Sequence, residues 1–174
     1  DGWLYFGTDV ANMCDPARSI DETLQRLDRL AEAVEASGRR FVLTIAPDKT
    51  TVVPENLPDS YLGQDCAAER RQAFWDALRS ASPDWYVDLR GPLEDEQDRS
   101  GPIYRPTDTH WAPHGAAVYA RELAGHLDRR LLDDFEVVEN GTATRPGDLG
   151  RMLGSRSEDE FPDVSIERPG VAPV

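Results

Sequence analysis

The sequence predicts an α/β fold in which helices flank a parallel sheet. Residues 41–46 and 85–89 are short runs rich in β-branched and aromatic side chains, which suits strands buried on both faces of such a sheet. Helical patterns stand between and after these runs, so that strands and helices alternate along the chain. A chain of 174 residues can bury a full core, and we expect a single domain over residues 1–174.

The first elements follow from local signals. Residues 3–6 (WLYF) form an apolar run that stops at Gly7, and we predict a strand there. A capping box that begins at Ser19, followed by apolar residues at helical spacing, predicts a helix over about 20–37. Gly38 then suits the position just after a helix.

The middle of the chain contains two further predicted helices. Prolines break residues 47–58 into a loop, and residues 66–80 carry a loosely amphipathic helical pattern. The acidic stretch 94–98 is expected to be a solvated loop. Pro113 suits a first helical position, which predicts a helix to about residue 130, and residues 135–138 predict a strand at the edge of the sheet.

The last part of the chain, residues 140–174, is expected to be rich in loops. Gly, Pro, Ser and acidic residues dominate it, and only Leu149, Met152 and Leu153 could anchor a short helix. The sequence also begins without a methionine. We therefore expect the N-terminal part of a domain that is truncated at the C-terminus.

Charge and hydropathy exclude some partners. The 33 acidic and 19 basic residues give a formal charge of −14, which repels nucleic acids and anionic membranes. No apolar run approaches the roughly 18 residues of a membrane-spanning helix. Lys49 is the only lysine among the basic residues.

The two cysteines, Cys14 and Cys66, allow two interpretations. If they form a disulfide, the closed loop would add up to about 4 kcal/mol in the chain-entropy model and would indicate an oxidising compartment. The alternative is two buried free thiols. Two isolated cysteines without paired spacing disfavour a zinc site.

The densest polar cluster is residues 104–111 (YRPTDTHW). Asp108 and His110 are two positions apart, so their side chains project to the same side of an extended segment. The carboxylate can hold one imidazole nitrogen and fix the tautomer, which leaves the other nitrogen free as a general base. The alternative is a purely structural hydrogen bond that tethers the loop. Metal binding by Asp108, His110 and His114 lacks a familiar ligand spacing, and we predict no metal.

Four segments in the same order resemble one known family. Residues 1–7 (DGWLYFG), 46–58 (APDKTTVVPENLP), 107–116 (TDTHWAPHGA) and 147–153 (GDLGRML) are together similar to the AlgX/AlgJ family of alginate O-acetyltransferases. The resemblance implies an SGNH-hydrolase-like (flavodoxin-like) fold and a Ser-His-Asp triad without a cofactor. It further implies O-acetylation or de-acetylation of an extracellular or cell-wall polysaccharide outside the cytoplasm (periplasmic, cell-surface or secreted). The acetyl donor would be a partner such as a membrane acyl-transfer protein.

Carried onto this sequence, the resemblance makes His110 the general base and Asp108 its orienting partner. Lys49 follows a predicted core strand and is expected to contact substrate or to form a salt bridge that holds its loop. Tyr104 and Arg105 precede the Asp-His pair and are expected to contact sugar or to stabilise an oxyanion.

The nucleophile departs from the family pattern. In the family the serine follows the Asp-x-His motif, in a Gly-Asp/Thr-Ser-like turn after a later strand, and no such turn occurs between His110 and Val174. Ser155, Ser157 and Ser165 do not fit it, and the turn at Gly7 offers a threonine. We therefore expect the serine beyond Val174. The alternatives are a non-catalytic carbohydrate-binding or scaffold module and a generic esterase, and the acidic charge argues against alginate itself as substrate.

Overall fold

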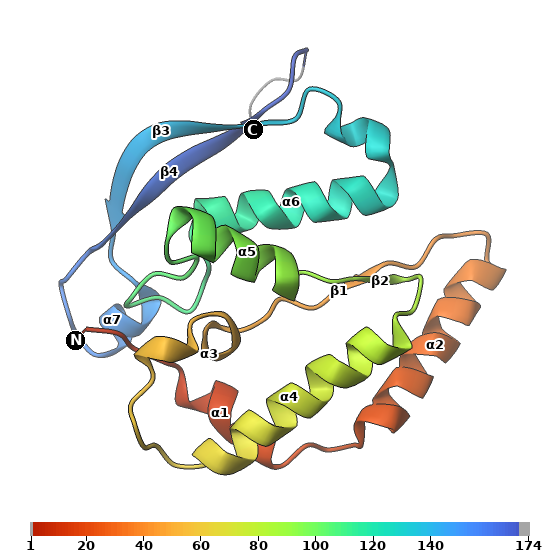
Figure 1. The fold of residues 1–174 in the computed structure, drawn as a ribbon, viewed down its shortest axis with the longest axis horizontal. Helices are drawn as coiled ribbons and strands as arrows, with labels where there is room; N and C mark the ends of the chain where they lie inside the picture. Colours follow the sequence, from red (N-terminus) through yellow and green to blue (C-terminus); the bar gives the residue numbers. More distant parts are fainter. Residues whose placement is uncertain (1, 171–174) are drawn as a thin grey trace. The chain divides into compact units, whose positions relative to one another are not determined.

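The computed structural model describes residues 2–170 (Figure 1). The chain forms two compact units. We call residues 2–6, 45–57 and 88–170 the dyad unit, because it contains Asp108 and His110. Residues 7–44 and 58–87 form the disulfide unit, which contains both cysteines. The expectation of a single domain over residues 1–174 stays a prediction.

The disulfide unit contains three helices and two short strands. They are α1 (Gly7–Cys14), α2 (Ile20–Ala36), β1 (Leu43–Thr44), α4 (Gln64–Ala81) and β2 (Tyr86–Val87). The strands β1 and β2 pair in parallel, with Leu43 opposite Tyr86 and Thr44 opposite Val87. The two predicted runs therefore pair in parallel, although each forms only two residues of strand. The expected burial of the run 41–46 on both faces is wrong, because residues 41–45 are only half-buried and Ala46 is exposed.

Local signals in this unit place α2 and α4 correctly. The hydroxyl of Ser19 accepts a hydrogen bond from Glu22 N at 3.1 Å, which caps the start of α2. Gly38 follows the helix with φ +78°, a conformation that glycine adopts without strain. Phe41 and Trp85 pack edge to face with their ring centroids 5.7 Å apart.

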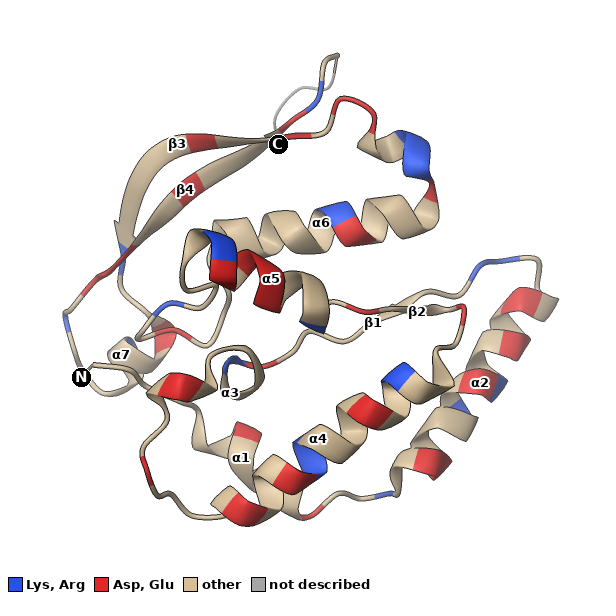
Figure 2. Ribbon diagram, viewed as in Figure 1, with Lys and Arg blue, Asp and Glu red and all other residues tan. Residues whose placement is uncertain are grey.

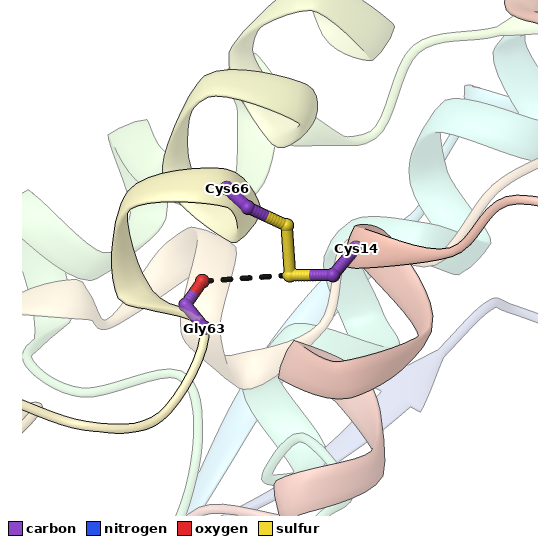
Figure 3. The surroundings of a disulfide bond; sticks show 3 residues. All are labelled: Cys14, Gly63 and Cys66. Carbon is purple, nitrogen blue, oxygen red and sulfur yellow. Dashed lines mark hydrogen bonds between the residues drawn. A yellow bond between two sulfur atoms is a disulfide. The ribbon is translucent and has the colours of Figure 1, made fainter.

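The two cysteines lie at the ends of helices. Cys14 ends α1 and Cys66 lies in the first turn of α4, and a disulfide joins them with their Cα atoms 5.5 Å apart (Figure 3). Gly63 precedes α4 with φ +83°, and its carbonyl oxygen is 3.5 Å from Cys14 Sγ. The bond therefore ties α1 to the start of α4.

The dyad unit contains the remaining elements. They are α3 (Lys49–Val52), η1 (Pro54–Asn56), α5 (Arg90–Ser100), α6 (Pro113–Leu127), η2 (Arg129–Leu132), β3 (Glu136–Arg145), α7 (Asp148–Met152) and β4 (Asp159–Glu167). The strands β3 and β4 are antiparallel, with an irregularity between Glu139 and Thr142, and run side by side in Figure 1. Helix α6 packs against β4, α5 and η2.

The predicted strand at residues 3–6 is wrong. Leu4 N donates one hydrogen bond to Pro106 O at 2.9 Å, but Leu4 O accepts from the Lys49 ammonium instead of from a neighbouring strand. Residues 3–6 therefore do not form a ladder of backbone hydrogen bonds with a neighbouring strand. The predicted turn at Gly7 is also wrong, because Gly7 begins helix α1.

Two segments that were predicted to be loops form regular secondary structure instead. The acidic stretch 94–98 lies inside α5, where Arg90 pairs with Glu94 at 2.7 Å and Leu93 is fully buried. The region 140–170 is not mainly loop, because β3 and β4 pair along most of their length. Most residues of β3 are exposed, so this strand lacks the apolar alternation that reveals a half-buried strand.

Three smaller predictions concern the ends and partners of elements. The strand predicted at 135–138 exists as the start of β3 but belongs to a separate antiparallel sheet. The loop predicted at 47–58 contains α3 and η1. The short helix expected near Leu149 is confirmed as α7. Residues 171–174 of the expected loop region lie outside the described residues.

Each unit buries a set of apolar side chains, and the dyad unit also buries polar ones, among them Lys49, Asp108 and Asp159. The buried hydrophobic residues of the dyad unit are Val52, Val53, Leu89, Leu93, Ile103, Tyr104, Ala112, Ala117, Val118, Leu149 and Phe161. Those of the disulfide unit are Val10, Ala31, Ala67, Trp75, Leu78, Trp85 and Val87. Acidic residues occur on the ribbons of both units in Figure 2. Within residues 2–170, no helix is long and apolar enough to span a bilayer.

Candidate active site

The candidate site lies on a short loop of the dyad unit that is closed at both ends. Tyr104 and Trp111 form an antiparallel bridge, and Ala112 N donates to Ile103 O at 2.7 Å. Pro113 then begins α6 directly after this closure. Because the closure leaves only residues 105–110 between the bridged positions, Asp108 and His110 are presented on a restrained loop.

Asp108 and His110 form the predicted pair. Asp108 Oδ1 accepts hydrogen bonds from His110 N at 2.8 Å and from His110 Nδ1 at 2.9 Å. The Asp108 side chain is 4% exposed and the His110 side chain is 76% exposed. With its proton on Nδ1, the imidazole keeps Nε2 as an acceptor, and no residue of the described chain hydrogen-bonds to Nε2.

The second carboxylate oxygen of Asp108 is also bound. The Arg105 guanidinium pairs with Asp108 Oδ2, and Asp148 N donates to the same oxygen at 3.1 Å. Arg105 itself stacks over the Phe161 ring at 5.0 Å. A buried carboxylate is costly unless it is paired and hydrogen-bonded, and these contacts meet that requirement.

Asp148 is a site residue that our inspection of the sequence missed. Its Oδ1 accepts from Thr109 N at 2.8 Å and its Oδ2 from Thr109 Oγ1 at 2.5 Å. Its Oδ2 also lies 3.5 Å from His110 Nδ1. Partial burial alone would raise the pKa of Asp148, but the bonds from Thr109 and Leu149 and the adjacent His110 outweigh burial and lower it. The only sequence signal was the position of Asp148 in the fourth family-like segment.

The segment around Asp148 fits closely against the loop. Gly150 N donates to Thr107 O at 3.1 Å, and Thr107 N and Oγ1 both donate to Asp159 Oδ2 at 2.9 Å. A Cβ atom on Gly147 would lie 2.0 Å from Thr107 O, so the close approach requires glycine. We call these contacts, from residues 147–150 and Asp159 to residues 107–109, the clasp.

Lys49 is buried beside the loop. Its ammonium donates to the carbonyl oxygens of Leu4, Arg105 and Pro106 at 2.7–2.8 Å and approaches Asp108 O at 3.2 Å. The ammonium also lies over the rings of Trp3 and Tyr5, with 4.9 and 5.1 Å from Lys49 Nζ to the two ring centroids. Burial lowers the pKa of Lys49 to about 8.

The three residues predicted to bind substrate all have internal partners. Besides Lys49 and Arg105, the Tyr104 hydroxyl donates to Pro47 O, and Tyr104 is buried. These contacts favour the holding role that the sequence left open for Lys49, although its acceptors are carbonyl groups rather than a carboxylate. A substrate contact by any of the three stays a prediction.

One group of side chains has ligand atoms close enough together to bind a metal ion. Ligand atoms of Asp108, His110 and Asp148 lie within 4.8 Å of one another, and His114 is not part of any such group among residues 2–170. The oxygens of both carboxylates already accept hydrogen bonds from Arg105, Thr109, His110 and main-chain N–H groups.

The serines downstream of the loop have other partners. Ser155 and Ser157 hydrogen-bond to each other at 2.7 Å between α7 and β4, and Ser165 accepts from Asn140 at 3.1 Å. Within the described chain, none of the three hydrogen-bonds to His110.

Comparison with known proteins identifies the family. The model of the family described as SGNH hydrolase-like domain, acetyltransferase AlgX, matches residues 1–168. The chain belongs to this family. The AlgX family assignment confirms the resemblance and the predicted SGNH-hydrolase-like fold class.

The relatives and solved structures agree with this assignment. Probable alginate O-acetylase AlgJ of Pseudomonas aeruginosa is 30% identical over 183 residues, covering 97% of this chain and 43% of that protein. The AlgJ of Pseudomonas syringae pv. tomato is 28% identical, covering 88% of this chain and 40% of its own length. The chain thus spans less than half of these relatives.

Two solved structures have the same fold. The O-acetyltransferase domain of Pseudomonas putida AlgJ aligns with a TM-score of 0.60 at 23% identity, covering 97% of this chain and 62% of that one. Pseudomonas aeruginosa AlgX aligns with a TM-score of 0.66 at 20% identity, covering 98% of this chain and 44% of that one.

Proposed function

We propose that this chain supplies the acid–base part of an O-acetyltransferase or acetylesterase site that acts on a polysaccharide. The observation that carries the proposal is the pairing of His110 Nδ1 with the buried carboxylate of Asp108, which leaves Nε2 on an exposed ring. This is the arrangement of a general base whose tautomer is fixed by a carboxylate. The AlgX family and the alginate O-acetylase relatives support the acetyl-transfer chemistry.

The reaction would run in two steps. A serine hydroxyl gives its proton to His110 Nε2 while its oxygen attacks the acetyl carbonyl carbon. The bond from the acetyl group to the donor breaks, and the departing donor takes the proton from Nε2. A sugar hydroxyl then gives its proton to Nε2 while its oxygen attacks the acetyl carbonyl carbon. The bond between the acetyl group and the serine oxygen breaks, and that oxygen takes the proton back from Nε2; water in place of the sugar gives hydrolysis.

Asp108 would act throughout by holding the imidazole. It keeps the proton of His110 on Nδ1 and stabilises the imidazolium that forms when Nε2 takes a second proton. Arg105 compensates the buried charge of Asp108, so that the carboxylate stays ionised.

The serine would come from outside residues 1–174, since none of the described serines has the family-like turn or a bond to His110. The rival proposal is a binding or scaffold module of the same fold without a nucleophile. The two differ in whether His110 is needed for acetyl transfer.

The acceptor would be an extracytoplasmic polysaccharide, and the donor an acetylated partner such as a membrane acyl-transfer protein. The disulfide supports an oxidising compartment. The net charge of −14 disfavours nucleic acid as a partner and argues against a strongly anionic acceptor, unless local positive charge offsets it.

The test uses the complete polypeptide as it is encoded. Cleavage of a chromogenic acetyl ester and acetyl transfer to a neutral and to an anionic polysaccharide are measured for the wild type, His110→Ala and His126→Ala. His126 lies on α6 outside the loop and serves as the matched control. We expect His110→Ala to lose about 10²- to 10⁴-fold in rate and His126→Ala to match the wild type. Polysaccharide binding without acetyl transfer in the wild type would favour the module.

A further inference from the structure

We infer that Asp148 is a positioning residue for His110. Its carboxylate holds Thr109, the residue before His110, and also lies near His110 Nδ1. This inference rests on the proposed function, because it assigns Asp148 a part in the same reaction. It does not require a direct contact between Asp148 and substrate.

Asp148 contacts Thr109, which stands between the two residues of the dyad. Asp148 binds both the main-chain N–H and the hydroxyl of Thr109, at 2.8 and 2.5 Å. Two bonds from one carboxylate fix both the backbone and the side chain of Thr109. Because Thr109 connects Asp108 to His110, the direction in which the His110 side chain leaves the loop is fixed with it.

The segment of Asp148 and the loop of Asp108 exchange hydrogen bonds. Asp148 N donates to Asp108 Oδ2 at 3.1 Å, while the Asp148 side chain accepts from the loop. The two segments therefore bind each other in both directions. A shift of α7 would disturb Asp108 and Thr109 together, so the positions of the two carboxylates are coupled.

Asp148 also acts on His110 through its negative charge. Asp148 Oδ2 lies 3.5 Å from His110 Nδ1, beside the 2.9 Å contact from Asp108, and the Asp148 side chain is 28% exposed. Asp108 is neutralised by Arg105, whereas no arginine or lysine of the described chain pairs with Asp148. When Nε2 takes a proton, Asp148 thus supplies a second negative charge close to the imidazolium.

The proposal gives Asp148 a different role from a structural tie. Substitution of a purely structural residue would lower stability alone, whereas substitution of a positioning residue lowers turnover more than substrate binding. A misplaced base costs about 10²-fold in rate for a displacement on the order of 1 Å. We therefore expect kcat to fall and KM to stay close to that of the wild type when Asp148 loses its charge.

The variants are Asp148→Asn, Asp148→Glu and the control Asp95→Asn. Asparagine keeps the shape but loses the charge and one acceptor, and glutamate restores the charge on a longer side chain. Asp95 is an exposed carboxylate of α5 outside the site, so its substitution changes the net charge equally.

Two measurements are made on the complete polypeptide. Esterase kinetics should show kcat about 10- to 100-fold lower in Asp148→Asn, with KM within about two-fold of the wild type and partial recovery in Asp148→Glu. Carbon-13 relaxation of the His110 ring should show a mobile ring in Asp148→Asn and a restrained ring in the wild type and in Asp95→Asn. Thermal unfolding is recorded for every variant to separate these effects from stability.

The outcomes separate the two proposals. If the wild type has no acetyl chemistry but Asp148→Asn releases the His110 ring, the proposed function fails and the holding role of Asp148 stands. If the wild type is active and Asp148→Asn changes neither kcat nor ring mobility, the inference is overturned and the proposed function stands. Activity that EDTA abolishes and zinc restores would also overturn it, because Asp148 would then be a metal ligand.

Discussion

The two units hold their parts together by different means. In the disulfide unit, a covalent bond ties α1 to α4, and the aromatic side chains of Trp75 and Trp85 are buried. In the dyad unit, the loop that carries Asp108 and His110 is held by polar contacts from the clasp and from Lys49.

The difference shows what each arrangement can achieve. Apolar packing and a cross-link stabilise a fold but tolerate small displacements of a side chain. Hydrogen bonds to fixed main-chain atoms set the position of a reactive group more narrowly, as a catalytic site requires. We therefore expect substitutions in the clasp to affect the dyad, and substitutions in the disulfide unit to affect stability alone.

The largest effect is expected from Gly147→Ala. The new Cβ would lie 2.0 Å from the main-chain oxygen of Thr107, so the clasp must open. We expect a loss of about 3 kcal/mol in the free energy of unfolding and a displaced His110, measured by urea denaturation and by the His110 ring signals. Gly7→Ala is the control, because its Cβ meets no atom within 4 Å. Unchanged His110 signals in Gly147→Ala would show that the clasp does not position the dyad.

Removal of the disulfide should cost slightly less and leave the dyad intact. The double variant Cys14→Ser/Cys66→Ser loses the constraint on the unfolded chain, which is worth about 2–4 kcal/mol. Urea denaturation measures the loss, and treatment of the wild type with a reductant should reproduce it. His110 ring signals that move in this variant would contradict the separation between the two units.

Lys49→Met should destabilise the dyad unit by about 2–3 kcal/mol at pH 7, because buried carbonyl oxygens lose their donor. The variant also tests the pKa of about 8, which lies below the ordinary 10.5. Between pH 8 and 10.5 the unfolded chain holds the Lys49 proton more often than the folded chain does. Folded-state stability should therefore rise with pH across this window in the wild type.

The same rise should be absent in Lys49→Met, measured as the free energy of unfolding at a series of pH values. Tyr5→Phe is the companion variant. Burial raises the pKa of Tyr5 to about 12, so this residue opposes the rise only above about pH 10. A wild type whose stability falls steadily from pH 8 would contradict the burial of the Lys49 ammonium.

The smallest effect is expected from Ser19→Ala in the disulfide unit. Its hydroxyl caps α2 through one hydrogen bond to Glu22 N, and loss of such a cap costs about 1 kcal/mol. Urea denaturation should detect this loss while acetyl chemistry stays at the level of the wild type. A change in esterase rate would mean that the disulfide unit influences the dyad.

Local signals in the sequence predicted much of the fold. The capping box at Ser19, the proline that opens α6 and the apolar runs of β1 and β2 all depend on neighbouring residues, which a sequence displays directly. The β3–β4 pair was missed because most residues of β3 are exposed. The strand predicted at 3–6 does not form, because Lys49 takes a main-chain acceptor there.

Lys49 was expected at the site, but contacts between individual residues were predicted only where the residues are close in sequence. Asp108 and His110 are two positions apart, and their contact was expected from an extended segment. The structure confirms the pair but not the extended backbone, because residues 105–110 form turns and bends and the Asp108 carboxylate accepts from both His110 N and His110 Nδ1. Asp148, Asp159 and Lys49 reach the same loop from far along the chain. Such contacts depend on tertiary folding, and no spacing rule in a single sequence reveals them.

The central claim is that Asp108 holds the proton of His110 on Nδ1 and leaves Nε2 as the base. A long-range proton–nitrogen spectrum of the three imidazole rings, recorded at a pH where they are neutral, identifies the tautomer directly. We predict the Nδ1–H form for His110 in the wild type and a mixture of tautomers in Asp108→Asn. A wild-type His110 that carries its proton on Nε2 would contradict the claim.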